Sequence, residues 1–277
     1  MIDAHVHFWK YHSEKDAWIT DEMRLLQKDF FPNDLAPVLR ENNVDGIVAV
    51  QADQSENETQ FLIDLSKKFS LIKGIVGWTD LQSAHVEERL NFYSQQKIIK
   101  GFRHIVQAEA GGFLQKEKFL NGVRALQLFG FTYDLLIYEN QLKEAIDFVN
   151  KFPDQKIIID HCAKPFIRNK KMEEWENGIK EISRNENVYC KVSGLITEAV
   201  WNQWNEDVLY PYLDVVFEYF GTKRLLFGSD WPVMLLSGTY SGWKQFLQKY
   251  LDQFPLNEIQ NVFINNAIQF YNLKPNS

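Results

Sequence analysis

Two histidines stand two positions apart near the start of the chain. The residues around them predict a strand from which His5 and His7 project on one face, because side chains two apart share a face of a strand. On the same strand, Ile2, Ala4 and Val6 are expected to pack against helices. Neutral imidazole is a good ligand for zinc and similar ions, so the pair indicates one side of a divalent cation site. Two histidines held by hydrogen bonds are the structural alternative.

Two more polar residues stand where apolar runs end. His161 ends a β-branched run and is soon followed by Pro165, and Asp230 ends an apolar run that Pro232 interrupts. Proline discourages continuation of a strand, so both residues are expected at strand ends. Strand parity places His161 on the face of Ile159. A carboxylate at the position of Asp230 can bind a metal, act as a general base, or cap the following helix.

Arg103 and His104 follow each other at the end of another β-rich run. Neighbours on a strand point to opposite faces, so only one of them is expected in a site unless the strand ends between them. Arg103 suits an anionic or oxygen-rich substrate, because guanidinium is a rigid fork of donors. A structural ion pair or a hydrogen-bonded core histidine is the alternative. Lys191 and Ser193 close a further strand, and either side chain could reach a pocket.

These residues must be positioned by strands that alternate with helices. Eight β-rich segments recur along the chain, namely Ile2–Phe8, Gly46–Gln51, Gly74–Trp78, Ile98–His104, Thr132–Ile137, Lys156–His161, Val188–Ser193 and Arg224–Asp230. Helical periodicity lies between them, as in Asn57–Lys68, Gln141–Lys151 and Glu173–Arg184. Alternation of this kind predicts parallel strands with crossover helices, and about 250 residues suffice for eight units. We therefore predict a single TIM-type (β/α)8 barrel over residues 1–277. The long connection from about Trp9 to Asn43 follows the first strand, and it either contacts substrate or forms a surface cover with short helices.

Composition narrows the classes of function. The net charge of −7 and the lack of a basic stripe argue against nucleic acid as a partner. No apolar run approaches the length of about 18 residues that spans a membrane. The two cysteines form no disulfide framework and are expected to be reduced and buried, which favours the cytoplasm. The helical pattern predicts no particular oligomeric state.

Taken together, the motifs resemble the amidohydrolase superfamily. The likeness is strongest to its amidohydrolase-2 branch, which contains sugar-lactone hydrolases such as fuconolactonase and rhamnonolactonase. It extends from Ile2 to about Leu273 and rests on an ordered set of motifs: Asp3-Ala4-His5-Val6-His7, Gly101-Phe102-Arg103-His104, Asp160-His161-x-x-Lys164-Pro165, Lys191-x-Ser193-Gly194, Gly228-Ser229-Asp230-Trp231-Pro232 and Asn266-Ala267-x-x-Phe270-Tyr271.

The resemblance implies roles for the polar residues. Asp230 would activate the hydrolytic water, and His161 would orient or polarise the substrate. His5 and His7, with these two residues, are the positions where the superfamily holds metal, and a single divalent ion such as zinc fits best. The segment Thr132–Ile137 lacks the histidine that many metal-dependent members carry there, and no carboxylated lysine is evident. A binuclear site is therefore not expected, and some lactonases of the branch need no metal.

The predicted reaction is hydrolysis of a small sugar lactone to its acid. A lactone is an activated ester, so one carboxylate base and one donor to the oxyanion can suffice. Arg103 or a zinc ion would share the oxyanion with His161, and the predicted substrate contacts are His104, Trp9, Lys164 and Trp231. Two alternatives remain: a metal-dependent decarboxylase of the same superfamily, and a barrel that binds a sugar acid without turnover.

Overall fold

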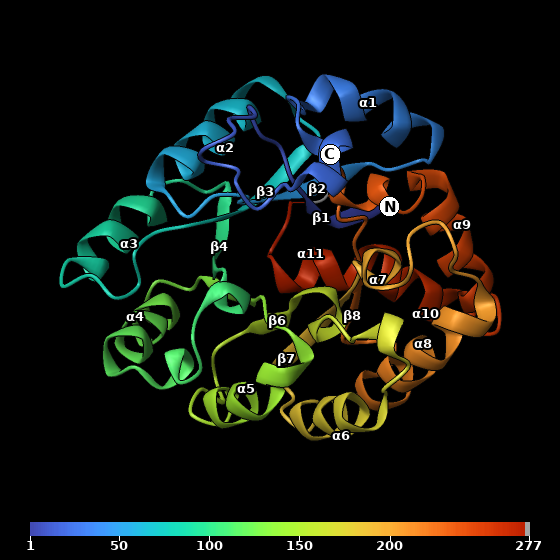
Figure 1. Cartoon of the computed structure of the whole chain (residues 1–277). Helices are drawn as coiled ribbons and strands as arrows, with labels where there is room; N and C mark the ends of the chain where they lie inside the picture. The colour runs from blue at the N-terminus through green and yellow to red at the C-terminus, as the bar shows by residue number, and fades with distance from the viewer. Residues whose placement is uncertain (275–277) are drawn as a thin grey trace.

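The computed structural model describes residues 1–274, in which eight parallel strands follow one another around a barrel in chain order (Figure 1). They are β1 (Ile2–Val6), β2 (Gly46–Val50), β3 (Ile72–Gly77), β4 (Ile99–His104), β5 (Thr132–Leu135), β6 (Ile157–Ile159), β7 (Val188–Val192) and β8 (Leu225–Phe227). A parallel bridge between Val6 and Trp231 joins the end of β8 to β1. The predicted (β/α)8 barrel is confirmed.

Helices surround the ring of strands in Figure 1. They are α1 (Pro32–Glu41), α2 (Glu56–Lys68), α3 (Val86–Ser94), α4 (Glu117–Leu128), α5 (Leu142–Val149), α6 (Glu173–Ile182), α7 (Leu195–Glu198), α8 (Glu206–Phe220), α9 (Tyr240–Leu251), α10 (Leu256–Gln260) and α11 (Asn266–Phe270). Ser55 shows why α2 begins where it does, because its hydroxyl accepts the N–H of Glu58 as an N-cap. The helices predicted around α2, α5 and α6 are confirmed, with their ends shifted by at most two residues.

The core has two apolar layers. An outer layer packs the strands against the surrounding helices. An inner cluster brings Val48, Ile158 and Leu226 together inside the barrel with Phe270 and Tyr271 near the end of the chain. Figure 1 shows α11 lying across the middle of the ring. Lys100 near the start of β4 donates to the carbonyl of Asn272 just after α11, and Lys156 just before β6 donates to a carbonyl within α11. The helix α11 therefore covers the amino ends of the strands, and the carboxyl ends are left for a site.

The first strand departs from regular alternation. Ile2 and Ala4 belong to the inner cluster, so the prediction that they pack against the helices is wrong, whereas Val6 lies in the outer layer as predicted. The register of β1 against β2 shifts between Asp3 and Val6, and a carboxylate oxygen of Asp3 accepts the N–H of His5 at 3.1 Å. This irregularity lets Ala4 and His5 both face inward, because a bulge places neighbouring residues on one face.

The connection from Trp9 to Asn43 lies between β1 and β2 and is the longest link between consecutive strands. It contains a 3-10 helix, Asp21–Leu26, and then α1, and an antiparallel bridge joins Trp9 to Phe30.

Cys162 and Cys190 are buried and free. Within residues 1–274, no helix combines the length and apolarity needed to cross a bilayer.

Candidate active site

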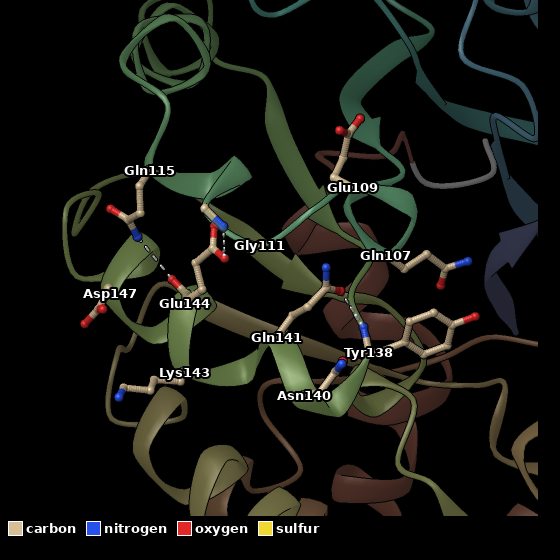
Figure 2. Close-up of a pocket in the computed structure, with 11 residues that line it drawn as sticks. Gln107, Glu109, Gly111, Gln115, Tyr138, Asn140, Gln141, Lys143, Glu144 and Asp147 are labelled. Atoms are coloured by element: carbon tan, nitrogen blue, oxygen red, sulfur yellow. Dashed lines mark hydrogen bonds between the residues drawn. The ribbon is translucent and has the colours of Figure 1, made fainter.

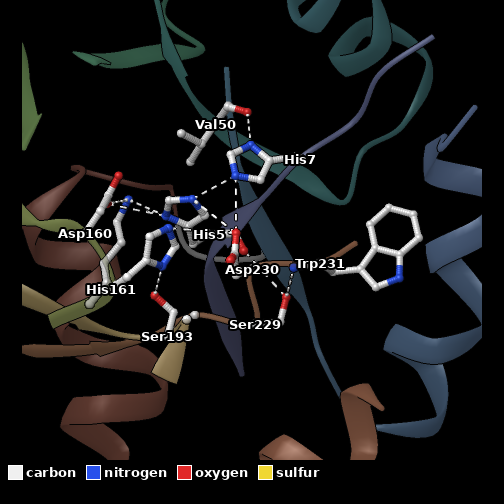
Figure 3. Close-up of polar contacts among 12 residues, drawn as sticks. His5, His7, Val50, Asp160, His161, Ser193, Ser229, Asp230 and Trp231 are labelled. Carbon is white, nitrogen blue, oxygen red and sulfur yellow. Dashed lines mark hydrogen bonds and ion pairs between the residues drawn. The ribbon is translucent and has the colours of Figure 1, made fainter. Parts of the chain in front are cut away.

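Three histidines and a carboxylate meet at the carboxyl ends of β1, β6 and β8 (Figure 3). Oδ1 of Asp230 is 3.3 Å from Nε2 of His7 and 3.8 Å from Nε2 of both His5 and His161. The Nε2 atoms of His5 and His7 are 3.0 Å apart. All four residues are at least 95% buried. We call these four residues the histidine cluster; ligand atoms of His5, His161 and Asp230 all lie within 4.8 Å of one another, and His7 is in contact with His5 and Asp230.

Glycines allow this close approach. A Cβ atom at Gly228 would lie 2.9 Å from Cβ of His5, and one at Gly194 would lie 2.7 Å from Cβ of His161. Gly194 also has a φ of 70°, which favours glycine. Asp230 itself has a φ of 61°, an uncommon conformation for a non-glycine residue. A residue in such a backbone conformation costs about 1–3 kcal/mol of folding free energy, and strained residues of this kind are typical of functional sites.

His161 reaches the site by a route that strand parity did not predict. Ile159 faces the outer layer and Ile158 the interior, so regular alternation would turn His161 outward. The strand ends at Ile159, however, and the backbone is left-handed from His161 to Lys164, with φ of 54° at His161. The predicted shared face of His161 and Ile159 is therefore wrong, and the turn brings the imidazole back into the barrel.

The second ring nitrogen of two histidines is held by the barrel. Nδ1 of His7 donates to the carbonyl of Val50 at 2.8 Å. In the neutral ring, Nε2 then carries no proton and has a free lone pair. Nδ1 of His161 lies 2.8 Å from the hydroxyl oxygen of Ser193. Contacts of this kind set the tautomer and the orientation of metal-binding histidines. Both rings are therefore held with Nε2 directed at Asp230.

His5 provides a test of whether these residues suit a metal ion. Its Nδ1 is 3.4 Å from Oδ1 of Asp160 and 3.2 Å from Nζ of Lys191. That buried oxygen of Asp160 is paired with Lys191 at 2.9 Å, and its second lone pair can accept an Nδ1 proton when Nε2 binds an ion. Tetrahedral zinc with bonds of about 2.0–2.1 Å places ligand atoms about 3.3 Å apart, close to the separations found here. The donor set therefore fits a single divalent ion.

Electrostatics favours neutral imidazoles beside an ionised carboxylate. Burial lowers the pKa of His161 to about 4, and burial is also the main reason why the pKa values of His5 and His7 are lowered. Burial alone would raise the pKa of Asp230, but the interactions of its carboxylate with the rings of His161 and His7 outweigh burial and hold that pKa below its ordinary value. These are the protonation states that metal binding and general-base catalysis both need.

A second group of buried charges lies behind His5. Nζ of Lys191 is 2.5 Å from Oδ2 of Asp134 and 2.9 Å from Oδ1 of Asp160, whose other oxygen accepts from Arg103 at 3.0 Å. The hydroxyl of Tyr271 also donates to Asp134 at 2.8 Å. Burial raises the pKa of Asp134 to about 6, although Lys191 opposes the shift. We call Arg103, Asp134, Asp160 and Lys191 the balanced cluster, because two cations face two carboxylates.

A cavity of about 760 Å³ opens over the histidine cluster. His7, His161 and Asp230 border it, as does Arg103 from the balanced cluster. Its wall also includes Lys15, Trp18, Gln54, Gln107, Tyr138, Lys164, Glu198 and Trp201. Part of the long connection after β1 therefore borders the site. The volume is within the range of small-molecule sites.

Sequence comparison places this arrangement in a known family. A family model described as Amidohydrolase matches residues 2–273. The chain belongs to the amidohydrolase family. This confirms the resemblance inferred from the motifs. An L-fucono-1,5-lactonase of Burkholderia multivorans is 33% identical over 91% of this chain and 88% of its own length, and one of Burkholderia ambifaria is 32% identical over 98% and 95%.

Two further comparisons extend the likeness of this amidohydrolase. An L-rhamnono-gamma-lactonase of Scheffersomyces stipitis is 26% identical over 74% of this chain and 70% of its own length. The crystal structure of an amidohydrolase from Burkholderia multivorans with bound zinc has a TM-score of 0.95 at 32% identity and covers 99% of both chains. A relative of nearly the same fold thus holds zinc.

His104 lies outside the cavity wall of this amidohydrolase. Its Nε2 is 2.8 Å from Oε1 of Glu109, and its ring stacks on Phe113 with centroids 4.5 Å apart. Arg103, on the opposite face of β4, borders the cavity. Of the two neighbours, only Arg103 faces the site, which is the outcome that strand alternation predicts.

The two predicted tryptophan contacts also lie away from the cavity wall. The indole of Trp9 donates to the carbonyl of Lys28 at 2.9 Å, and the ring packs edge-on against Phe30. Trp231 packs edge-on against Phe8 and Phe30, and Figure 3 shows its ring pointing away from the histidines. Among the predicted substrate contacts, the structure therefore brings only Lys164 together with the catalytic candidates.

Several polar residues of the cavity wall were not predicted from the sequence, among them Glu198 and Tyr138. Glu198 ends the short helix α7, and Tyr138 follows β5. Both stand in segments just after predicted strands, which is where a (β/α)8 barrel builds its site. That placement was the available signal. Burial is the largest influence on Glu198 and raises the pKa of its carboxyl group.

A second hollow of about 510 Å³ lies beside the first, between the segment after β4 and α5 (Figure 2). The carboxylate of Glu144 accepts the backbone N–H groups of Gly112 at 2.8 Å and Leu114 at 2.6 Å. Asp147 and Lys143 border the hollow from α5. Its wall contains neither histidine nor cysteine. The second hollow therefore lacks the imidazole groups that the catalytic candidates provide in the first cavity.

Proposed function

We propose that this amidohydrolase opens a sugar lactone to its acid, with Asp230 as the base that activates water. The convergence of three Nε2 atoms on one oxygen of Asp230, at the floor of a cavity, carries the proposal. The lactonases that the chain resembles support this class of substrate. L-Fuconolactone and L-rhamnonolactone are the first candidates.

In the proposed reaction, an oxygen of Asp230 takes a proton from water as the water attacks the lactone carbonyl. The bond between that carbon and the ring oxygen then breaks. The ring oxygen leaves with less need of protonation than an amine, and it takes up the proton held by Asp230, which becomes a carboxylate again. Arg103 borders the cavity with a guanidinium that can donate to the developing oxyanion. His161, held through Nδ1 by Ser193, can present Nε2 to the same charge.

His5, His7, His161 and Asp230 are the residues that would hold a divalent ion such as zinc. A bound ion would polarise the carbonyl and lower the pKa of water. We expect elemental analysis to find about one zinc ion per chain, because the donor set fits one ion. Replacement of His7 by Asn should reduce that content, since its Nε2 lies 3.3 Å from Asp230.

The test is a panel of aldonolactones followed with a pH indicator, with and without a chelator. We expect hydrolysis of at least one six-carbon lactone and no release of carbon dioxide from aromatic acids. The chelator arm separates a required ion from a dispensable one. Failure of the zinc-loaded enzyme to open any lactone would overturn the proposal. Release of carbon dioxide from an aromatic acid would favour the decarboxylase alternative. Tight binding of a sugar acid without turnover of any lactone would favour the alternative of a non-catalytic binding barrel.

A further inference from the structure

Two opposite charges on the cavity wall have hydrogen-bonding capacity to spare. The side chains of Lys164 and Glu198 are only 17% and 20% exposed, and Nζ lies 4.0 Å from Oε1. That distance is too long for a direct hydrogen bond. Among residues 1–274, neither side chain makes a hydrogen bond, although Nζ of Lys164 lies 5.4 Å from the ring centre of Tyr138.

Polar groups that are fully buried are nearly always hydrogen-bonded within the protein, whereas these two side chains keep part of their surface open to the cavity. Glu144 in the second hollow shows the ordinary state, with both carboxylate oxygens accepting backbone N–H groups. Arg168 shows it near Glu198 too: its guanidinium donates to the carbonyls of Thr197 and Ala199 and stacks on a neighbouring ring. Arg168 thus holds the end of α7, while Glu198 itself is left facing the cavity.

The pair also lies close to the reacting groups. Lys164 follows His161 by three residues, in the left-handed turn that brings the imidazole inward. Glu198 ends α7, whose N-cap Gly194 is in contact with His161. Both side chains border the same cavity as Asp230. A ring held over the histidine cluster therefore comes within reach of both charges.

Building on the proposed function, we propose that Glu198 and Lys164 select lactones that carry hydroxyl groups on adjacent ring carbons. An ionised carboxylate has two acceptor oxygens, which can take the protons of two neighbouring hydroxyls. The ammonium of Lys164 offers three donors to oxygens of the same ring. A substrate with adjacent hydroxyls would thus hydrogen-bond to both charges, whereas a lactone without hydroxyls would displace solvent from the two side chains and give them no hydrogen bond in return.

The experiment compares kcat/KM for a polyhydroxylated six-membered lactone and for δ-valerolactone, which has the same ring and no hydroxyls. Singly hydroxylated δ-lactones complete the series. The variants are Glu198→Gln and Lys164→Met. Their matched controls are Asp147→Asn and Lys143→Met, which remove the same charges from the second hollow. Melting temperatures confirm that each variant is folded.

The wild type should prefer the polyhydroxylated lactone by about 100-fold or more. Glu198→Gln should lower kcat/KM for that lactone by roughly 10- to 100-fold, mainly through KM, and for δ-valerolactone by less than about threefold. Lys164→Met should shift the preference in the same direction, and the controls should leave it unchanged.

Two results would overturn the inference while leaving lactone hydrolysis intact. One is an equal fall for both lactones in Glu198→Gln, which would indicate a structural or general catalytic role. The other is a wild type that turns over both lactones equally well. If the wild type opens no lactone at all, the proposed function fails, and this inference fails with it.

Discussion

The histidine cluster and the balanced cluster are neighbours, and both are buried, yet their charges are arranged differently. In the balanced cluster, Lys191 and Arg103 pair with Asp134 and Asp160 at 2.5–3.0 Å. In the histidine cluster, one carboxylate faces three imidazoles whose pKa values are lowered, so within the described part of the chain, residues 1–274, its charge is paired with no buried cation at neutral pH.

The difference shows that buried charge by itself does not mark a site. In a buried ion pair, the attraction between the two charges offsets much of the cost of removing them from water. Such pairs can also hold neighbouring side chains in place. Lys191 and Asp160 do this for His5, whose Nδ1 they contact. An unbalanced carboxylate at the floor of a cavity is instead available to a proton, a cation or a substrate. We therefore propose chemistry for the histidine cluster and support for the balanced cluster, except that the guanidinium of Arg103 also borders the cavity.

The largest effect is expected from Asp230→Asn. The amide keeps the shape of the side chain but cannot take a proton, so kcat/KM for the lactone should fall by about 10³- to 10⁴-fold. The thermal melt should stay nearly unchanged, because no paired charge is lost. Steady-state kinetics and a melting curve check both statements. Near-normal activity in this variant would contradict the assignment of the base.

In the balanced cluster, Lys191→Met should act on stability first. Removal of one partner leaves Asp134 buried without its cation, which costs about 3–5 kcal/mol of unfolding free energy. Asp134→Asn combined with Lys191→Met should recover at least half of that loss, because Arg103 still pairs with Asp160. Urea unfolding measures both variants. If the double variant is less stable than Lys191→Met, the balance of charge is not what stabilises this cluster.

Glu58 gives a reference outside both clusters. Burial raises the pKa of this carboxyl group from 4.5 to about 7, while Lys15 at 3.8 Å opposes the shift and Asp16 and Asp53 add to it. The folded state thus holds the proton more tightly than the unfolded state. The contribution of Glu58 to wild-type stability should therefore fall as pH rises from about 4.5 to 7, by up to about 3 kcal/mol.

Glu58→Gln removes this titration. Its unfolding free energy, relative to the wild type, should rise across the same pH interval by up to about 3 kcal/mol. Urea unfolding at pH 5 and at pH 7.5 makes the comparison. Parallel pH profiles for the two proteins would show that Glu58 titrates normally.

The smallest effect is expected from His104→Ala. The variant loses a contact with Glu109 and a stacked ring, so unfolding free energy should fall by about 1–2 kcal/mol. Because the ring lies outside the cavity wall, kcat/KM should change by less than about threefold. A large loss of activity in a folded variant would return His104 to the substrate contacts that the sequence predicted.

Much of the fold followed from local pattern. Apolar runs with period-two character, separated by helical segments, predicted all eight strands to within a few residues. The same pattern predicted that His5, His161 and Asp230 stand at strand ends, because a polar residue after an apolar run marks the edge of the core. It failed at Ala4 and His161, where a bulge and a left-handed turn override alternation.

By itself, the sequence determined the barrel, the family and the catalytic candidates, because these depend on residue types at short spacing. Only the tertiary structure decided which groups meet. Lys191 pairs with Asp134 across 57 residues, and Lys164 after β6 faces Glu198 after the neighbouring strand β7. Such contacts depend on how the ring of strands closes and where its loops turn, and no local period encodes either.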